Sequence, residues 1–141
     1  MTVTRIYIPL NASGLRSLTT DRALGAAPFL AHAVTEAVRA SAATSGQDEW
    51  EYTALNDAAQ SSGLLLTSGE RRRIVAAADV VPELVGPAAP TYATGESAVS
   101  IVDSVALQRI ASFLVDSENA SEDEELLWYD VTELPAIRAL L

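Results

Sequence analysis

The sequence predicts a single α+β domain over residues 1–141, with a mixed or mainly antiparallel sheet of five to six strands and helices packed on one face. The length fits one domain. A composition of 49% hydrophobic and 20% charged residues is typical of a folded chain with a core. Short strand-like segments also alternate with helix-like ones. No stretch of about 20 apolar residues occurs, so we expect no membrane-spanning segment.

The chain opens with a strand followed by a helix. Residues 4–10 alternate between isoleucines on one side and Arg5 and Tyr7 on the other, which predicts a half-buried strand that ends at Pro9. Asn11 is a favourable N-cap residue. The helix that follows it presents two leucines, three residues apart, on one face.

The next elements are a strand and two helices. We expect the strand at residues 29–35, a short helix at 36–42 and a long helix at 49–66. Asp48 and Glu51 have the spacing of a capping box at the start of the long helix. The stripe of that helix predicted to face the core consists of Tyr52, Leu55, Ala59, Ser62 and Leu66.

The second half is predicted to be richer in strands. Residues 74–78 form a continuous apolar run, which favours a central strand covered on both faces. Residues 80–95 contain three prolines and predict a long loop of the kind that is functional or mobile. We expect one helical turn at residues 105–110 and a last helix capped by Thr132, with Pro135 in its first turn. Further strands are predicted at 98–102, 112–115 and 126–130.

The charge and the absence of cysteine exclude several function classes. Nineteen acidic residues against nine basic residues, all arginine, give a net charge of −10. Such a chain repels nucleic acid and anionic membranes, so we expect neither as a partner. Without cysteine there are no disulfides, zinc fingers or catalytic thiolates. We expect a cytoplasmic protein with no cofactor.

Several fragments of the chain are familiar as a set. They are residues 5–10 (Arg-Ile-Tyr-Ile-Pro-Leu), 33–35, 72–79, 125–129 (Glu-Leu-Leu-Trp-Tyr) and 132–135. In this order they resemble a small actinobacterial protein family of unknown function. The resemblance implies an intracellular protein of actinobacterial origin. It implies no activity, so no functional residue is transferred from it.

The sequence offers little for catalysis. His32 is the only histidine, and Glu36 would share its face only if both were helical. Because His32 falls in a predicted strand, we expect a structural role for it. The chain contains no Gly-x-Ser-x-Gly motif, which a nucleophile elbow would require. These observations predict that the protein is not an enzyme.

Two acidic clusters were considered as metal sites. Asp48, Glu49 and Glu51 form the first, and residues 122–125 form the second. Neither contains the glycine of a calcium-binding loop. The first cluster is better interpreted as a helix cap and the second as a solvated acidic segment. Loose binding of divalent ions by the second cluster remains an alternative, and we expect no dedicated metal site.

Residues 70–73 (Glu-Arg-Arg-Arg) are the only basic cluster. Guanidinium groups bind phosphates and carboxylates bidentately. On a strand, however, Arg72 would point away from Arg71 and Arg73, so the three would not form one patch. A structural role is favoured, and contact with a ligand or partner stays open. Neither a Walker motif nor Gly-x-Gly-x-x-Gly supports nucleotide binding.

The aromatic residues give the most specific functional hypothesis. Trp50 lies off the predicted core stripe, so it is either partly exposed or packed against a second layer. Trp128 and Tyr129 alternate on a strand, so we expect one in the core and one on the opposite face. Exposed aromatic side chains beside carboxylates are typical of an interface for a basic partner. The candidate partner surface is Trp50, Glu122, Asp123, Glu124, Glu125 and Tyr129.

The favoured function is therefore a non-enzymatic protein-interaction or regulatory module that docks a basic protein. The alternative is a small-molecule-binding domain closed by residues 80–95, and a carboxylate-dependent enzyme is a third, weaker hypothesis. The sequence predicts no oligomeric state.

Overall fold

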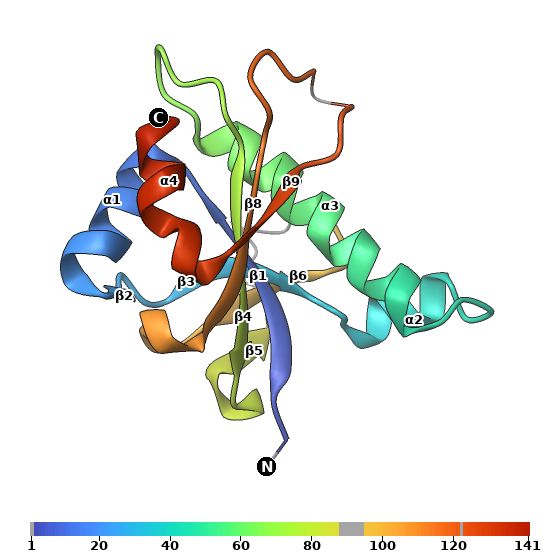
Figure 1. Cartoon of the computed structure of the whole chain (residues 1–141). Coiled ribbons are helices and arrows are strands. Elements are labelled where there is room, and N and C mark those ends of the chain that lie inside the picture. Colours follow the sequence, from blue (N-terminus) through green and yellow to red (C-terminus); the bar gives the residue numbers. More distant parts are fainter. Residues whose placement is uncertain (1, 88–94, 122) are drawn as a thin grey trace.

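The computed structural model describes residues 2–87, 95–121 and 123–141 (Figure 1). Its strands are β1 (Thr4–Leu10), β2 (Ala23–Leu24), β3 (Phe29–Ala33), β4 (Ile74–Val80), β5 (Val85–Pro87), β6 (Ala98–Ile101), β7 (Val105–Ala106), β8 (Ile110–Val115) and β9 (Leu127–Asp130). Its helices are α1 (Ala12–Asp21), α2 (Glu36–Ser41), α3 (Gln47–Leu65) and α4 (Leu134–Ala139). Short 3₁₀ turns lie at Pro82–Leu84, Leu107–Arg109 and Val131–Glu133.

The α+β class is confirmed, with more strands than expected. In the described part of the chain, seven strands form one sheet in the order β5-β6-β3-β1-β4-β8-β9, and all the pairings are antiparallel. β2 and β7 form a separate two-stranded sheet. Helices lie on both faces of the large sheet, α1 and α4 on one side and α3 on the other (Figure 1). Packing on one face was too narrow an expectation, because β1 and β4 are apolar on both sides.

Strand β1 continues past the proline that was expected to end it. It pairs with β4 over its whole length, including Pro9 opposite Val75. Its pairing with β3 is restricted to Ile6 and Tyr7. Pro9 therefore lies where β1 has one strand partner, so its missing N–H removes no hydrogen bond to β3.

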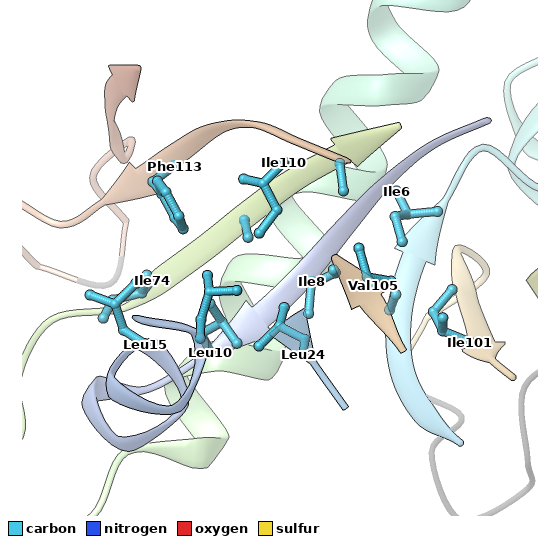
Figure 2. Packing of buried hydrophobic residues seen from close by; sticks show 14 of the residues in the cluster. Ile6, Ile8, Leu10, Leu15, Leu24, Ile74, Ile101, Val105, Ile110 and Phe113 are labelled. Atoms are coloured by element: carbon cyan, nitrogen blue, oxygen red, sulfur yellow. The ribbon is translucent and has the colours of Figure 1, made fainter. Parts of the chain in front are cut away.

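The main core lies on the side of the sheet that carries α1 and α4. Leu15 of α1 lies beside Ile74 in a cluster that also includes Ile8 and Phe113 (Figure 2), and Phe113 is paired with Tyr129 of β9. Asn11 caps α1 as predicted, accepting a hydrogen bond from the Gly14 N–H at 2.8 Å. Large aliphatic side chains that alternate along the strands supply this face.

Helix α3 packs on the opposite face through small side chains. Ala54 and Ala58 lie against Val75 and Ala77 of β4, so the helix approaches the sheet closely. The expected stripe is only partly correct, since Tyr52 is 48% exposed. The first residue of the helix also differs. Its cap is Gly46, whose N–H donates to the Glu49 carboxylate, and Asp48 already belongs to the first turn.

Three smaller expectations are corrected. The expected loop 80–95 contains β5 and a 3₁₀ turn, and its residues 88–94 lie outside the described chain. Residues 105–110 were expected to form one helical turn, but they form the short strand β7, which pairs with β2, and then a 3₁₀ turn. The last helix is preceded by a 3₁₀ turn that Asp130 caps, because its carboxylate accepts from the Thr132 N–H. Pro135 does lie in the first turn of α4.

Candidate functional site

A chain of hydrogen bonds runs through the only histidine. His32 of β3 is fully buried, with Nδ1 2.8 Å from the Ser97 Oγ and Nε2 2.8 Å from the Ser61 Oγ of α3. Ser97 donates its hydroxyl hydrogen to the Asp57 Oδ2 at 2.6 Å. Since that hydrogen is used, the Ser97 Oγ accepts from the His32 Nδ1–H. The network joins β3, α3 and the start of β6.

The burial of this network decides what it does. Burial lowers the pKa of His32, and the nearby Asp57 carboxylate opposes that shift. The order Ser61, His32, Ser97 is one in which a base could activate a serine, but Ser61 is only 4% exposed. No substrate reaches a hydroxyl enclosed between a helix and a sheet. The expectation of a structural histidine is therefore consistent with the geometry.

Close packing around Asp57 explains a glycine next to this network. A Cβ added at Gly95 would lie 2.7 Å from the Asp57 Oδ2, and the residue has a φ of +86°. Both conditions favour glycine, because other residues would be strained and would push the carboxylate away from Ser97. Gly95 thus lets the backbone bring Ser97 to His32.

A buried ion pair fixes the loop that carries the acidic segment. The Arg73 guanidinium donates to both Asp116 carboxylate oxygens, each at 2.8 Å, and both side chains are almost fully buried. Its Nη2 also donates to the backbone carbonyls of Ser121 and Glu124, at 3.3 and 3.0 Å. One arginine therefore holds both ends of residues 116–124 against β4, which is a structural role.

The other two arginines of the cluster face solvent. β4 begins at Ile74, so the strand alternation expected for residues 71–73 does not apply. Arg71 and Arg72 both line a pocket between loops, while Arg73 points inward to Asp116. The arginines thus divide into two that line a surface and one that is buried.

The acidic segment meets an aromatic side chain of α3. The Tyr52 hydroxyl donates to the Glu125 Oε1 at 2.9 Å. Asp123 is exposed, and Glu124 has the Ser117 hydroxyl 3.5 Å from its carboxylate. Glu122, also in the candidate surface, lies outside the described residues.

Trp128 is the most exposed aromatic residue near this segment. It is 64% exposed and opposes Leu114 of β8, on the face that carries α3. Its strand, β9, is an edge of the sheet. The Asp130 N–H donates to the Glu133 carboxylate at 2.7 Å, away from β8. Two residues earlier, the peptide groups of Trp128 point to the same open edge.

Two candidate aromatics have other roles. The Trp50 indole N–H donates to the Ala42 carbonyl at 3.0 Å, and the Arg39 guanidinium lies 5.8 Å from the ring centroid. Trp50 therefore packs against the end of α2, as one of the two expectations had it. Two residues of helix place it on the opposite side of α3 from Tyr52. Tyr129 is half-buried against the main core, so Trp128 is the exposed member of that pair.

The surface that the structure assembles differs from the predicted set in its aromatic members. Tyr52 was assigned to the core because its spacing fits a 3.6-residue period. The signal that could have corrected this was Ala54, Ala58 and Ser61, a second stripe of small residues with helical spacing. Ser61, Ser97 and Asp57 carried no pattern that sequence alone could connect to His32, because residues 57 and 97 meet only in the folded chain.

Across residues 2–87, 95–121 and 123–141, no group of three or more histidine, aspartate or glutamate side chains is arranged to hold a metal ion. In the same residues, the helices are too short or too polar to span a bilayer.

The chain matches one known family. Residues 4–123 match the model of DUF6912, a family of unknown function. The match covers the fragments at residues 5–10, 33–35 and 72–79, and the fragments from residue 125 onward lie beyond it. No curated protein and no solved structure matches the chain.

Proposed function

Since the chain belongs to DUF6912, a family of unknown function, we propose a role from its own surface: a non-enzymatic interaction module that docks a basic protein partner. The docking surface, called here the Trp128 surface, comprises Tyr52, Asp123, Glu124, Glu125 and Trp128. It keeps the acidic residues of the predicted set that the structure describes and replaces Trp50 and Tyr129.

The exposure of Trp128 is the observation that carries the proposal. An exposed tryptophan leaves a large apolar area in water, and tryptophan and tyrosine are the residues most enriched among interface hot spots. Tyr52, 48% exposed, and Trp128 come from α3 and β9, on the same face of the sheet. The Glu125 carboxylate contacts the Tyr52 hydroxyl, and Asp123, Glu124 and Glu125 lie three to five residues before Trp128 in the chain.

The Trp128 surface is held in place before a partner arrives. Arg73 holds Asp116 through the buried ion pair, and Ser121 and Glu124 through their backbone carbonyls. The hydrogen bond between Tyr52 and Glu125 ties the end of that segment to α3. A preorganised surface pays little conformational entropy on binding, which favours affinity.

Charge complementarity selects a basic partner. The chain has a net charge of −10, and the proposal is supported by three carboxylates adjacent in the chain, Asp123, Glu124 and Glu125, the last of which bonds to Tyr52. Such a field speeds the association of positively charged proteins and repels nucleic acid and anionic membranes. The open edge of β9 adds backbone groups to which an extended basic segment could pair.

The non-enzymatic part of the proposal is supported by the enclosure of the only histidine. His32 and Ser61 are buried, so this network braces the fold. A cytoplasmic location is part of the same proposal, supported by a cysteine-free sequence that needs no oxidising compartment.

The test uses the native chain beside Trp128→Ala and the triple variant Asp123→Gln, Glu124→Gln and Glu125→Gln as baits. Proteins captured from cell lysate are identified by mass spectrometry at about 0.1 M and about 1 M salt, where the Debye length falls from about 10 Å to about 3 Å. We expect one basic protein that the native chain captures at low salt, and at least tenfold less capture by either variant.

Leu64→Ala is the matched control, because Leu64 is a highly exposed apolar residue near the other end of α3. It should capture as much partner as the native chain. Equal capture by the native chain and Trp128→Ala, or no capture above background, would contradict the proposal.

A further inference from the structure

Two adjoining pockets gather arginine side chains on an otherwise acidic protein. The larger, of about 1180 Å³, is lined by Arg16 of α1 and by Arg71 and Arg72 of the loop before β4. The smaller shares Arg16 and adds Arg138 of α4. Of the nine arginines, four line these pockets, whereas Glu70 and Glu118 are the acidic residues that do so in the described chain.

Three of these four arginines form no side-chain hydrogen bond or ion pair within the described chain, and the side chain of the fourth, Arg72, donates only to the Asp116 carbonyl. The three are Arg16, Arg71 and Arg138. A chain with nineteen acidic residues could have paired them. Across the two pockets four arginines stand against two glutamates, so the lining has an excess of positive side chains that attracts an anion.

The fold brings these arginines together through Glu70. Its carboxylate accepts from the Ala12 N–H at 3.0 Å and from the Thr67 N–H at 2.8 Å, which ties the start of α1 to the loop before β4. Arg16 lies one helical turn after Ala12, so it projects from the same face of α1. Arg71 directly follows Glu70. The two guanidinium groups therefore line the same pocket from different elements.

The hydrogen-bonding capacity of the Glu70 carboxylate is largely used within the protein. The hydrogen bonds from the Thr67 hydroxyl and N–H, then that from Ala12, lower the pKa of Glu70, and the charge of Arg16 adds to the shift. Its carboxylate stays ionised and is engaged in backbone contacts. Its role is to hold together the two segments that carry Arg16 and Arg71.

The remaining lining mixes apolar residues such as Leu66 and Leu140 with hydroxyl side chains that can donate to the oxygens of an anion. The serine hydroxyls of Ser13 and Ser68 have no partner among the described residues, and Arg72 uses one of its guanidinium N–H groups on the Asp116 carbonyl at 2.9 Å. The donors that line the pocket come from α1, labelled in Figure 1, and from the two loops at residues 66–72 and 117–120. This arrangement fits the tetrahedral oxygens of phosphate better than one planar carboxylate.

We infer that this arginine pocket binds a small metabolite bearing more than one phosphate group. The pocket is larger than a single inorganic ion needs. No aromatic side chain lines it in the described residues, so no base-stacking platform is present. The site is separate from the Trp128 surface, and its ligand has the opposite charge to the partner proposed there.

The test measures binding of inorganic pyrophosphate by isothermal titration calorimetry, with the full chain at about 0.1 M salt. We expect a Kd below about 1 mM. Arg71→Gln should weaken binding about tenfold, since each charge-assisted pair contributes about that factor. The double variant Arg16→Gln, Arg71→Gln should abolish it. Neither side chain makes a contact that the fold needs, so both variants should have the same thermal unfolding midpoint as the native chain.

Arg109→Gln is the matched control, because Arg109 is exposed and without a partner in the described chain but lies away from both pockets. It should bind pyrophosphate as the native chain does. Citrate, a tricarboxylate, should bind at least tenfold more weakly. The inference is overturned if pyrophosphate does not bind, if Arg109→Gln weakens binding as much as Arg71→Gln, or if citrate binds as tightly as pyrophosphate.

Discussion

The two faces of the sheet are built from side chains of different size and polarity. On the face with α1 and α4, Ile8, Ile74 and Phe113 form a continuous apolar core. On the other face, α3 packs through alanines against Val75 and Ala77, and a buried histidine bonds to a serine of the helix. The first face is stabilised by packing of large apolar side chains. The second is stabilised by close approach of the helix to the sheet and by hydrogen bonds.

This difference explains where the proposed docking surface lies. The strands that α3 contacts most are β1, β3 and β4. Toward β8 and β9 the same face is less well covered: Leu114 is only partly buried against the α3 cluster, and Trp128 is 64% exposed. On the opposite face, α4 and the Val131–Glu133 turn cover that end, and Tyr129 is half-buried. The two faces therefore differ most in side-chain exposure at the edge strand β9.

The largest effect is expected from opening a cavity in the main core. Phe113→Ala should lower the free energy of unfolding by about 3–5 kcal/mol, because Phe113 is fully buried among residues that cannot collapse into the space. Urea denaturation measures the change. Leu127→Ala, on the same face but 48% exposed, should cost about 1 kcal/mol. Equal losses in the two variants would contradict the assigned core.

A smaller loss of stability is expected from adding side-chain volume under α3, in contrast to removing volume from the main core. Ala58→Leu adds volume where the helix meets β4, so it should destabilise the protein by about 1–3 kcal/mol. Gln60→Leu places the same side chain on the exposed side of α3 and should change stability by less than about 0.5 kcal/mol. A stabilising Ala58→Leu, measured by the same denaturation, would show that α3 does not pack closely.

The sequence predicted the main face better than the α3 face, for a physical reason. Ile6, Ile8 and the leucines of α1 are large, so their periodicity is visible and their burial follows. The contact surface of α3 is made of alanine and serine, which are also common on helix surfaces. The stronger apolar signal of Tyr52 and Leu55 therefore placed the stripe on the wrong side of the helix for Tyr52.

Long-range polar contacts account for what the sequence could not predict. Arg73 was interpreted with its neighbours as one basic run, but its burial depends on Asp116, 43 residues later. The arginine pocket joins residues from α1, two loops and α4, whose meeting follows from the strand order. The acidic segment was found because its residues are adjacent in the chain.

The smallest expected effect is a pH dependence of the unfolding free energy that comes from His32 on the α3 face. Burial lowers the pKa of His32 below its ordinary value of 6.5, so the unfolded chain takes up a proton more readily than the folded one. The contribution of His32 to stability is therefore complete above about pH 6.5 and decreases as the pH falls below it. One proton limits the slope to about 1.4 kcal/mol per pH unit.

Urea denaturation at about pH 7.5 and about pH 5.5 measures this contribution in the native chain and in His32→Gln, which keeps an amide able to bond to both serines. The native chain should lose more stability between the two pH values than the variant does. The Phe113→Ala variant should retain the native pH dependence, since Phe113 lies on the opposite face from the histidine. If His32→Gln lost as much stability on acidification as the native chain, the histidine would be exposed to water in solution. The description of the α3 face as one held by a buried, hydrogen-bonded histidine would then be wrong.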